Sequence, residues 1–102
     1  MRRVMVRYRT KADRADENAA YIEKVFEELH REWPDGLRYA SFRLDDGVTF
    51  VHVAEISTED GSNPLAATES FKAFQAELKD RCEEPPVATE LHQVGSFNLF
   101  NA

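Results

Sequence analysis

Cysteine is almost absent from the sequence, and this scarcity excludes two classes of protein. Cys82 is the single cysteine among 102 residues, so no disulfide can form within the chain and no cysteine-based zinc site can be assembled. Extracellular domains of this size commonly rely on disulfides, whereas proteins of a reducing compartment do not. We therefore expect a cytoplasmic location.

Long hydrophobic runs are also missing. No stretch of about 18 apolar residues occurs, so the sequence predicts no membrane-spanning helix. The first ten residues, MRRVMVRYRT, interrupt their apolar residues with arginines. A signal peptide needs a continuous apolar stretch, and we expect none here.

Basic charge is scarce outside the N-terminal region. The chain carries 13 Lys and Arg against 19 Asp and Glu, a net charge of −6, and six of the basic residues fall within residues 1–14. The acidic remainder would repel a phosphate backbone, and the N-terminal arginines alternate with apolar residues instead of forming a block. The sequence therefore predicts no nucleic-acid partner.

What is present is the composition of a globular protein. Hydrophobic residues make up 42% and charged residues 31% of the chain, which favours a packed core over disorder. The length predicts a single domain over residues 1–102.

Periodicity predicts an alternating order of strands and helices. Residues 2–10 alternate apolar and basic side chains as a strand does. A helical apolar stripe follows, with Asp13 as its N-cap and Pro34 at its end; its members are Ile22, Val25, Phe26, Leu29 and Trp33.

The second half of the chain predicts a hairpin, a helix and a strand. Two alternating runs flank Asp45-Asp46-Gly47, which is a strong hairpin signal. A second helix is predicted over residues 66–83, with Cys82 as a packing residue on its apolar stripe and Pro85-Pro86 closing it. Residues 87–94 give the last strand. The order βαββαβ predicts an α+β, ferredoxin-like antiparallel sheet with both helices on one face.

Alternation also predicts which side chains face the helices. The more apolar sets are assigned to the helix side: Val4, Val6, Tyr8; Ala40, Phe42, Leu44; Thr49, Val51, Val53. The opposite face then carries Met5, Arg7, Arg9; Tyr39, Ser41, Arg43; Phe50, His52, Ala54, Ile56, with either Glu90/His92/Val94 or Leu91/Gln93 from the last strand. This mixture suits a cavity closed by the sheet of a second copy, into which His52 would point.

Two segments carry a family resemblance. GLRYASFRLDDGVTFVHVAEI and FKAFQAEL resemble the antibiotic biosynthesis monooxygenase-like group of the dimeric α+β barrel superfamily. The resemblance implies a homodimer whose two sheets close into a barrel, with the site between sheet and helices or within the barrel. The group includes cofactor-free oxygenases that act on quinols and polyketide phenols, haem-degrading enzymes, and members without known activity.

The candidate site is centred on His52. A histidine among apolar neighbours titrates near neutrality and would serve as the acid/base group for a phenolic proton; the alternative is a neutral imidazole that only fixes the pocket. Arg7 and Arg43 are predicted to hold an anionic oxygen, or else to pair with Glu55, Glu90 or an acid of a second subunit. The other predicted substrate-binding residues are Tyr39, Ser41, Phe50 and His92.

The sequence predicts no metal and no cofactor. Glu90, His92 and His52 are the best ligand set available, and no cysteine or aspartate cluster supports it. The function predicted is a small cofactor-independent monooxygenase acting on an aromatic substrate. The alternative is a non-catalytic homodimer that binds a small ligand or serves in an assembly.

Overall fold

A four-stranded antiparallel sheet organises the chain. The computed structural model describes residues 1–99, so residues 100–102 of the predicted domain lie outside the described part. The strands are β1 (Arg2–Thr10), β2 (Leu37–Arg43), β3 (Thr49–Ile56) and β4 (Cys82–Leu91), arranged in the order β2-β3-β1-β4. Every neighbouring pair is antiparallel.

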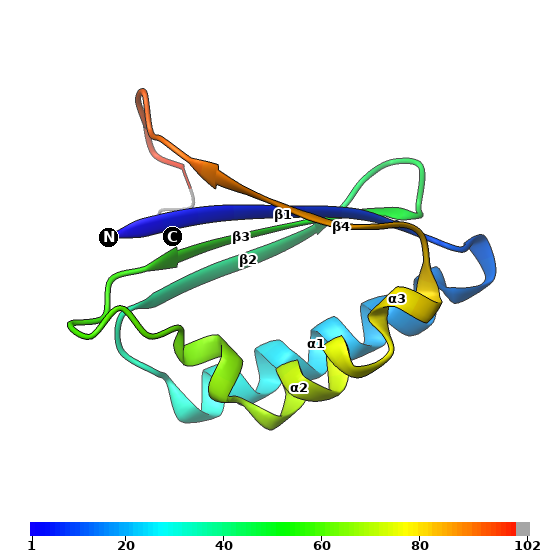
Figure 1. The fold of residues 1–102 in the computed structure, drawn as a ribbon, viewed down its shortest axis with the longest axis horizontal. Coiled ribbons are helices and arrows are strands. Elements are labelled where there is room, and N and C mark those ends of the chain that lie inside the picture. The colour runs from blue at the N-terminus through cyan, green and yellow to red at the C-terminus, as the bar shows by residue number, and fades with distance from the viewer. Residues whose placement is uncertain (100–102) are drawn as a thin grey trace.

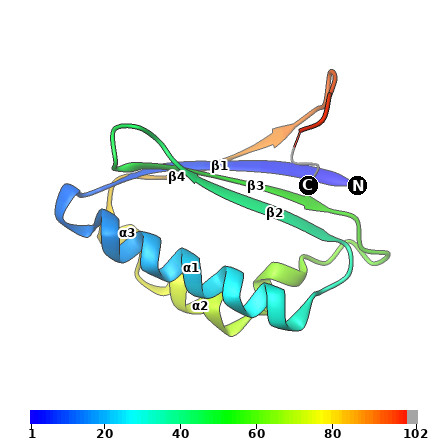
Figure 2. The same cartoon turned by 180° about the vertical axis from the view of Figure 1, so that it is seen from behind.

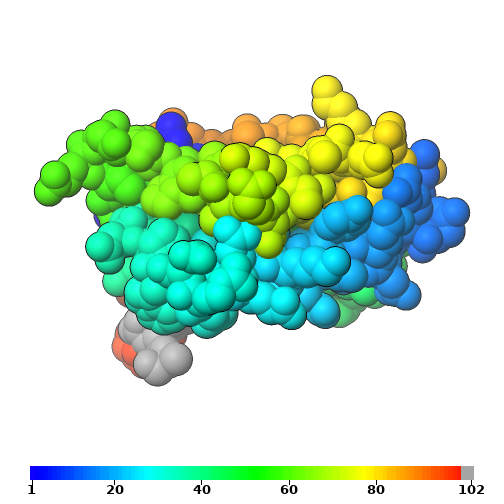
Figure 3. All heavy atoms as spheres, turned by 90° about the horizontal axis from the view of Figure 1, so that it is seen from below, coloured from blue at the N-terminus to red at the C-terminus, as the bar shows by residue number. Residues whose placement is uncertain are grey.

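The helices form a single layer on one side of this sheet (Figure 1 and Figure 2). They are α1 (Ala15–Glu32), α2 (Glu69–Ala76) and α3 (Leu78–Arg81), with short 3-10 turns at Ala12–Arg14 and Pro64–Ala67. From the helix side, α1 and α2 lie next to each other over the sheet (Figure 3). The predicted α+β, ferredoxin-like order is confirmed. No helix within residues 1–99 has the length and apolarity needed to cross a bilayer.

The β2–β3 hairpin forms as predicted. Gly47 has a positive φ of 77°, a backbone conformation that glycine adopts without strain. The Asp46 carboxylate accepts hydrogen bonds from the Thr49 hydroxyl and from the backbone N–H groups of Thr49 and Val48, and these bonds hold the pKa of Asp46 down, at about 2. The turn therefore fixes the register in which β2 and β3 pair.

The predicted second helix is wrong in its extent. The segment forms a 3-10 turn, then α2, then a break at Glu77, and only one further turn as α3. Cys82 begins β4 and does not lie on a helix, and the strand ends at Leu91, before His92. The prolines at 85 and 86 were misleading because β4 is an edge strand, where proline is tolerated.

The predicted faces of β2 and β3 are also wrong. Residues directly opposite in an antiparallel pair share a face, and Tyr8 lies opposite Phe50, while His52 lies opposite both Val6 and Ser41. This shared face packs against the helices, where the core is built from Tyr8, Ala15, Val25, Leu29, Phe50, Leu65, Phe74 and Leu78. His52 is therefore buried under the helices. The hydrophobic pattern placed His52 on the other face, because the pattern does not show that neighbouring side chains satisfy the two ring nitrogens by hydrogen bonds.

The face of the sheet away from the helices carries two valines of β3. Val51 and Val53 lie on it, opposite Arg7 and Met5 of β1. Val87 of β4 is 61% exposed on the same face. No element of residues 1–99 covers this side of the sheet in either ribbon view, and we refer to it as the open face.

Candidate functional site

A cavity of about 350 Å³ lies between the sheet and the helical layer. Its sheet wall includes Val6, Tyr8, Tyr39 and His52, and the other wall includes Leu65, Phe71 and Phe74. Apolar and aromatic walls with a few convergent polar groups are typical of small-molecule sites. The pocket is on the helix side of the sheet.

The imidazole of His52 is the centre of a buried polar cluster. Its Nε2 atom lies 2.7 Å from the Tyr8 hydroxyl oxygen. Its Nδ1 atom lies 2.6 Å from the Tyr39 hydroxyl and 2.7 Å from the Ser41 hydroxyl. Both ring nitrogens of His52, on β3, are therefore engaged by side chains from the two neighbouring strands, β1 and β2. The antiparallel register brings them together, because Ser41 pairs with His52 and Tyr39 is two residues away on the same face.

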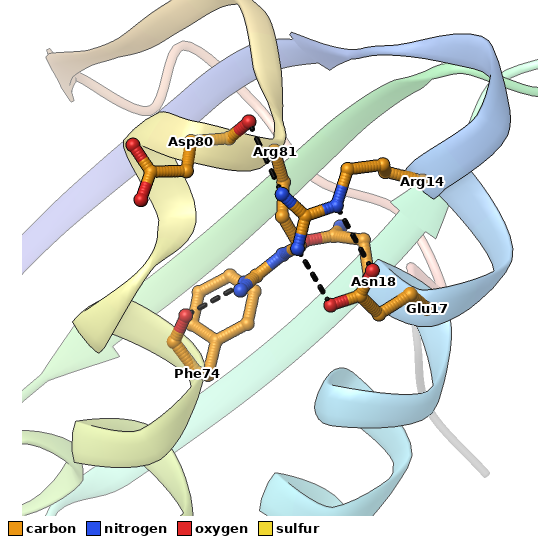
Figure 4. A network of polar contacts seen from close by, with 6 residues as sticks. All are labelled: Arg14, Glu17, Asn18, Phe74, Asp80 and Arg81. Carbon is orange, nitrogen blue, oxygen red and sulfur yellow. Dashed lines mark hydrogen bonds and ion pairs between the residues drawn. The ribbon is translucent and has the colours of Figure 1, made fainter.

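The cluster continues away from the pocket through Asn18 to Arg81. The Asn18 amide nitrogen donates to the Tyr8 hydroxyl at 2.8 Å, and Arg81 Nε donates to the Asn18 amide oxygen at 3.1 Å. Arg81 Nη2 donates to the Phe74 carbonyl at 2.7 Å. These contacts join α1, α3 and the end of α2 beneath the sheet (Figure 4).

Arg81 is buried completely, with 0% of its side chain exposed. Its guanidinium carbon lies 4.5 Å from the ring centre of Tyr21 and 5.5 Å from that of Phe74. Within residues 1–99 no carboxylate forms an ion pair with it, and its Nη1 atom has no hydrogen-bond partner. Glu17, drawn in the same region (Figure 4), is bound instead by Nε and Nη2 of Arg14.

Burial keeps the remaining members of the cluster neutral. It lowers the pKa of His52 to about 4 and raises the pKa of Tyr39 to about 12. Burial also raises the pKa of Tyr8, against a smaller opposing effect of the Asn18 hydrogen bond. Since an arginine guanidinium stays protonated in proteins, Arg81 supplies the one formal charge of this cluster at neutral pH.

Three of the predicted site residues meet in this cluster: Tyr39, Ser41 and His52. The others lie elsewhere. Phe50 is buried in the core, stacked 5.6 Å from Tyr8. Arg43 donates to Asp16 and to the Gly47 carbonyl, outside the pocket lining.

Arg7 and His92 are also separate from the pocket. Arg7 pairs with Val51 and Val87, and its side chain belongs to the open face. His92 follows the end of β4 and is exposed. Among residues 1–99 no group of three His, Cys, Asp or Glu side chains is arranged to hold a metal ion.

Sequence reasoning missed Tyr8, Asn18 and Arg81 as site residues. A signal for two of them exists in the sequence. Asn18 precedes Ile22 by four residues on the apolar stripe of α1, and Arg81 follows Phe74 by seven residues. A polar side chain at a stripe position is buried and therefore needs a partner.

Comparisons with known proteins identify the fold. No family model matches the sequence, and no curated protein matches it significantly. Among solved structures, an antibiotic biosynthesis monooxygenase superposes with a TM-score of 0.75 at 19% identity, over 93% of this chain and 100% of the other. SnoaB of Streptomyces nogalater (mutant N63A), described as a cofactor-independent oxygenase, gives 0.66 at 13% identity, over 93% and 94% of the two chains.

A third similar structure has no assigned activity. The NE2512 protein of Nitrosomonas europaea, described as being of unknown function, superposes with a TM-score of 0.72 at 14% identity, over 94% of this chain and 91% of the other. Similarity at these identities establishes the fold, while activity must be argued from the pocket itself.

Proposed function

We propose, since this chain has the fold of the antibiotic biosynthesis monooxygenase-like proteins, that it is a small monooxygenase that oxidises an aromatic substrate without a cofactor. The observation that carries the proposal is the pocket: a cavity of about 350 Å³ with Phe71 and Phe74 on one wall and the Tyr39–His52 pair on the other. An aromatic ring fits the apolar walls, and an oxygen substituent on it can hydrogen-bond to the polar pair.

The proposed reaction is balanced without an external reductant. In an anthrone-like phenol, the ring methylene loses two hydrogen atoms and gains one oxygen atom to become a carbonyl. The second oxygen atom of O₂ takes up the two hydrogens and leaves as water, so all four electrons come from the substrate. The phenol gives its proton to solvent and binds as the anion, which is the form that passes the first electron to O₂. A site that holds the anion therefore promotes the reaction.

The pocket geometry favours a supporting role for His52 over the acid/base role predicted from sequence. With its pKa lowered to about 4, the imidazole is a weak base. Its two nitrogens are also occupied by Tyr8 and by Tyr39 with Ser41. In the proposed mechanism His52 holds the Tyr39 hydroxyl in place, and Tyr39 is the group that touches the substrate.

A second candidate function is a non-catalytic protein that binds a small ligand. The observation that favours it is the pairing of Arg43 with Asp16, which removes one of the two arginines predicted to hold a substrate anion. A neutral pocket wall of Tyr39 and His52 also serves simple binding, since neither group needs to transfer a proton for a ligand to be held.

The proposed assembly is a homodimer formed through the open face. Its support is the partly exposed apolar surface around Val51, Val53 and Val87. The segment after β4 also rises away from the sheet on this side (Figure 1) and carries exposed Val94 and Phe97. Apolar surface of this kind on a sheet commonly marks an interface. The pocket lies on the opposite side, so dimerisation leaves it accessible.

Oxygen uptake by metal-free protein tests the proposed activity. The substrates are a panel of quinols and anthrone-like phenols, and the proteins are the wild type, Tyr39→Phe, His52→Ala and the control Lys24→Gln on the exposed side of α1. We expect uptake by the wild type and by the control, and a loss of at least about tenfold in the other two. Uptake that stays at the buffer background across the panel favours the ligand-binding alternative.

A further inference from the structure

The directions of two hydrogen bonds in the buried cluster follow directly from Arg81. A guanidinium has donors and no acceptor, so the Asn18 atom that faces Arg81 Nε must be the amide oxygen. The Asn18 amide nitrogen is then the atom that faces Tyr8, and it donates to the Tyr8 hydroxyl oxygen. The arginine thus fixes the orientation of the amide, and the amide fixes the next bond.

The next assignment is the tautomer of His52. Because the Tyr8 oxygen accepts from Asn18, its own proton needs an acceptor, and His52 Nε2 at 2.7 Å is the one that the described contacts provide. A neutral imidazole has one protonated and one unprotonated nitrogen. We take Nε2 as the acceptor, which pairs the Tyr8 proton inside the cluster and places the ring proton of His52 on Nδ1.

The Nδ1 proton decides where the Tyr39 proton points. Nδ1–H donates to the Tyr39 and Ser41 oxygens, which both lie within 2.7 Å of it. With Nδ1 acting as the donor, the Tyr39 and Ser41 hydroxyl protons both point away from the ring. Since Tyr39 lines the pocket and Ser41 does not, the pocket is where the Tyr39 proton is directed.

The series Arg81, Asn18, Tyr8, His52 and Tyr39, which we refer to as the donor chain, therefore runs in one direction. It begins at a buried cation with no carboxylate partner and ends at the pocket wall. Hydrogen bonds aligned in this way polarise one another, and a positive charge in a low-dielectric interior acts over a longer distance than it would in water. Both effects strengthen Tyr39 as a donor.

We propose that the donor chain aims the Tyr39 hydroxyl proton into the pocket, and that the pocket therefore takes an aromatic ligand by an anionic oxygen, as in a phenolate. Arg81, Asn18, Tyr8 and His52 are positioning residues in this arrangement, and Tyr39 is the member of the donor chain that hydrogen-bonds to the ligand oxygen. The inference rests on the proposed function in one respect, that this cavity is the binding site. It does not require that the bound ligand react with oxygen.

The first test reads the His52 tautomer in the free protein by ¹⁵N NMR of the histidine side chains. We expect the wild-type proton on Nδ1. In Asn18→Asp the isosteric carboxylate accepts from both Arg81 and Tyr8, so the Tyr8 oxygen must accept from His52 and the proton moves to Nε2. A wild-type protein with the proton on Nε2 overturns the proposal.

The second test measures the affinities of 4-nitrophenolate and nitrobenzene, which differ in the anionic oxygen. We expect the wild type to prefer 4-nitrophenolate by about tenfold or more, as one hydrogen bond to a charged group would give. Asn18→Asp and Tyr39→Phe should both lose this preference and keep their affinity for nitrobenzene. Arg81→Lys, which retains the charge and a donor, should keep part of it.

Tyr39→Phe keeps the test decisive if Asn18→Asp does not fold. This variant leaves the donor chain intact up to His52, so its tautomer should stay as in the wild type while the preference for the anion disappears. A preference that persists in Tyr39→Phe, or a wild type that binds neither compound or does not distinguish them, contradicts the proposal. None of these results depends on oxygen uptake, so the proposed activity can fail while the donor chain stands.

Discussion

His52 is tolerated in the core because each of its ring nitrogens has a polar partner. Its side chain is 5% exposed, and a buried imidazole without partners would cost several hydrogen bonds with water. The hydroxyls of Tyr8, Tyr39 and Ser41 replace that water. These hydroxyls form hydrogen bonds to both nitrogens of the neutral ring. The Tyr8 oxygen already accepts a hydrogen bond from Asn18, so a second proton on the His52 ring would have no ready acceptor.

At this scale we predict a pH-dependent contribution of His52 to stability. The pKa of His52 is about 4 in the folded protein and near 6.5 when unfolded. Between these values the unfolded state binds the extra proton, so stability is complete above about pH 6.5 and falls as the pH is lowered toward 4. We expect a loss of about 2–3 kcal/mol from this group by about pH 4.5.

Urea unfolding of the wild type and His52→Gln across this pH range measures the effect. The carboxylates titrate in both proteins, so their contribution cancels in the difference between the two curves. The difference in unfolding free energy should shrink as the pH falls. Parallel curves would show that His52 is not held neutral by the fold.

The sequence predicted the grouping of Tyr39, Ser41 and His52 but not their surroundings. Alternation and the Asp-Gly turn define which residues of β2 and β3 share a face, and this part was correct. The side on which the helices lie is decided by the packing of the whole layer. Asn18 and Arg81 are separated by 63 residues, so only tertiary structure brings them to the cluster.

Among the elements, α2 depends on contacts at its N-terminus. The Thr68 hydroxyl accepts from the Phe71 backbone N–H and donates to the Leu65 carbonyl. The Glu28 carboxylate of α1 accepts from the backbone N–H groups of Glu69 and Ser70. Two groups from outside the helix thus satisfy its first donors, which a short helix needs because it has few internal hydrogen bonds.

We predict that Thr68→Ala destabilises the protein by about 1–2 kcal/mol, the usual cost of losing an N-cap hydroxyl. Thr68 is buried, so solvent cannot replace the lost bond. Thr68→Ser keeps the hydroxyl and is the matched control, with an expected loss well below that of the alanine variant. Thermal and urea unfolding provide the measurement, and equal destabilisation by both variants would assign the effect to the lost methyl group.

The boundaries of elements were less predictable than their order. The strand 2–10 was predicted with the bounds that β1 has. The second helix was predicted to continue to residue 83 because its apolar stripe continues in register past Glu77. The backbone leaves the helical conformation at that residue. Periodicity does not record such a break, since Leu78 still packs into the core.

For the whole molecule, the open face sets the expected assembly. We predict that the wild type has the mass of two chains in solution and that Val51→Lys, which places a charge in the middle of this face, shifts it to one chain. Size-exclusion chromatography with light scattering measures both. Ala20→Lys, on the exposed side of α1, adds the same single charge elsewhere and should leave the mass unchanged. A monomeric wild type would contradict the proposed homodimer.

The sequence predicted that the sheet face carrying His52 is covered by a second molecule, whereas the helices of the same chain cover that face. Tyr39, Ser41 and His52 of the mixed polar and apolar set proved to be buried under the helices, where they bond to each other, whereas Met5 and Arg7 of that set lie on the open face. The purely apolar valines of β3 lie on the open face. A hydrophobic pattern reports that a surface is covered and does not report whether a helix or a second molecule covers it.

The two prolines of β4 have a consequence for aggregation. Successive backbone N–H groups point to opposite sides of a strand, so one proline removes a donor toward β1, where the pairing register shifts between Arg7 and Arg9, and the other removes a donor on the outer edge. An incoming strand cannot form a continuous ladder with an edge interrupted in this way. The prolines therefore make this edge of the sheet a poor template for an incoming strand.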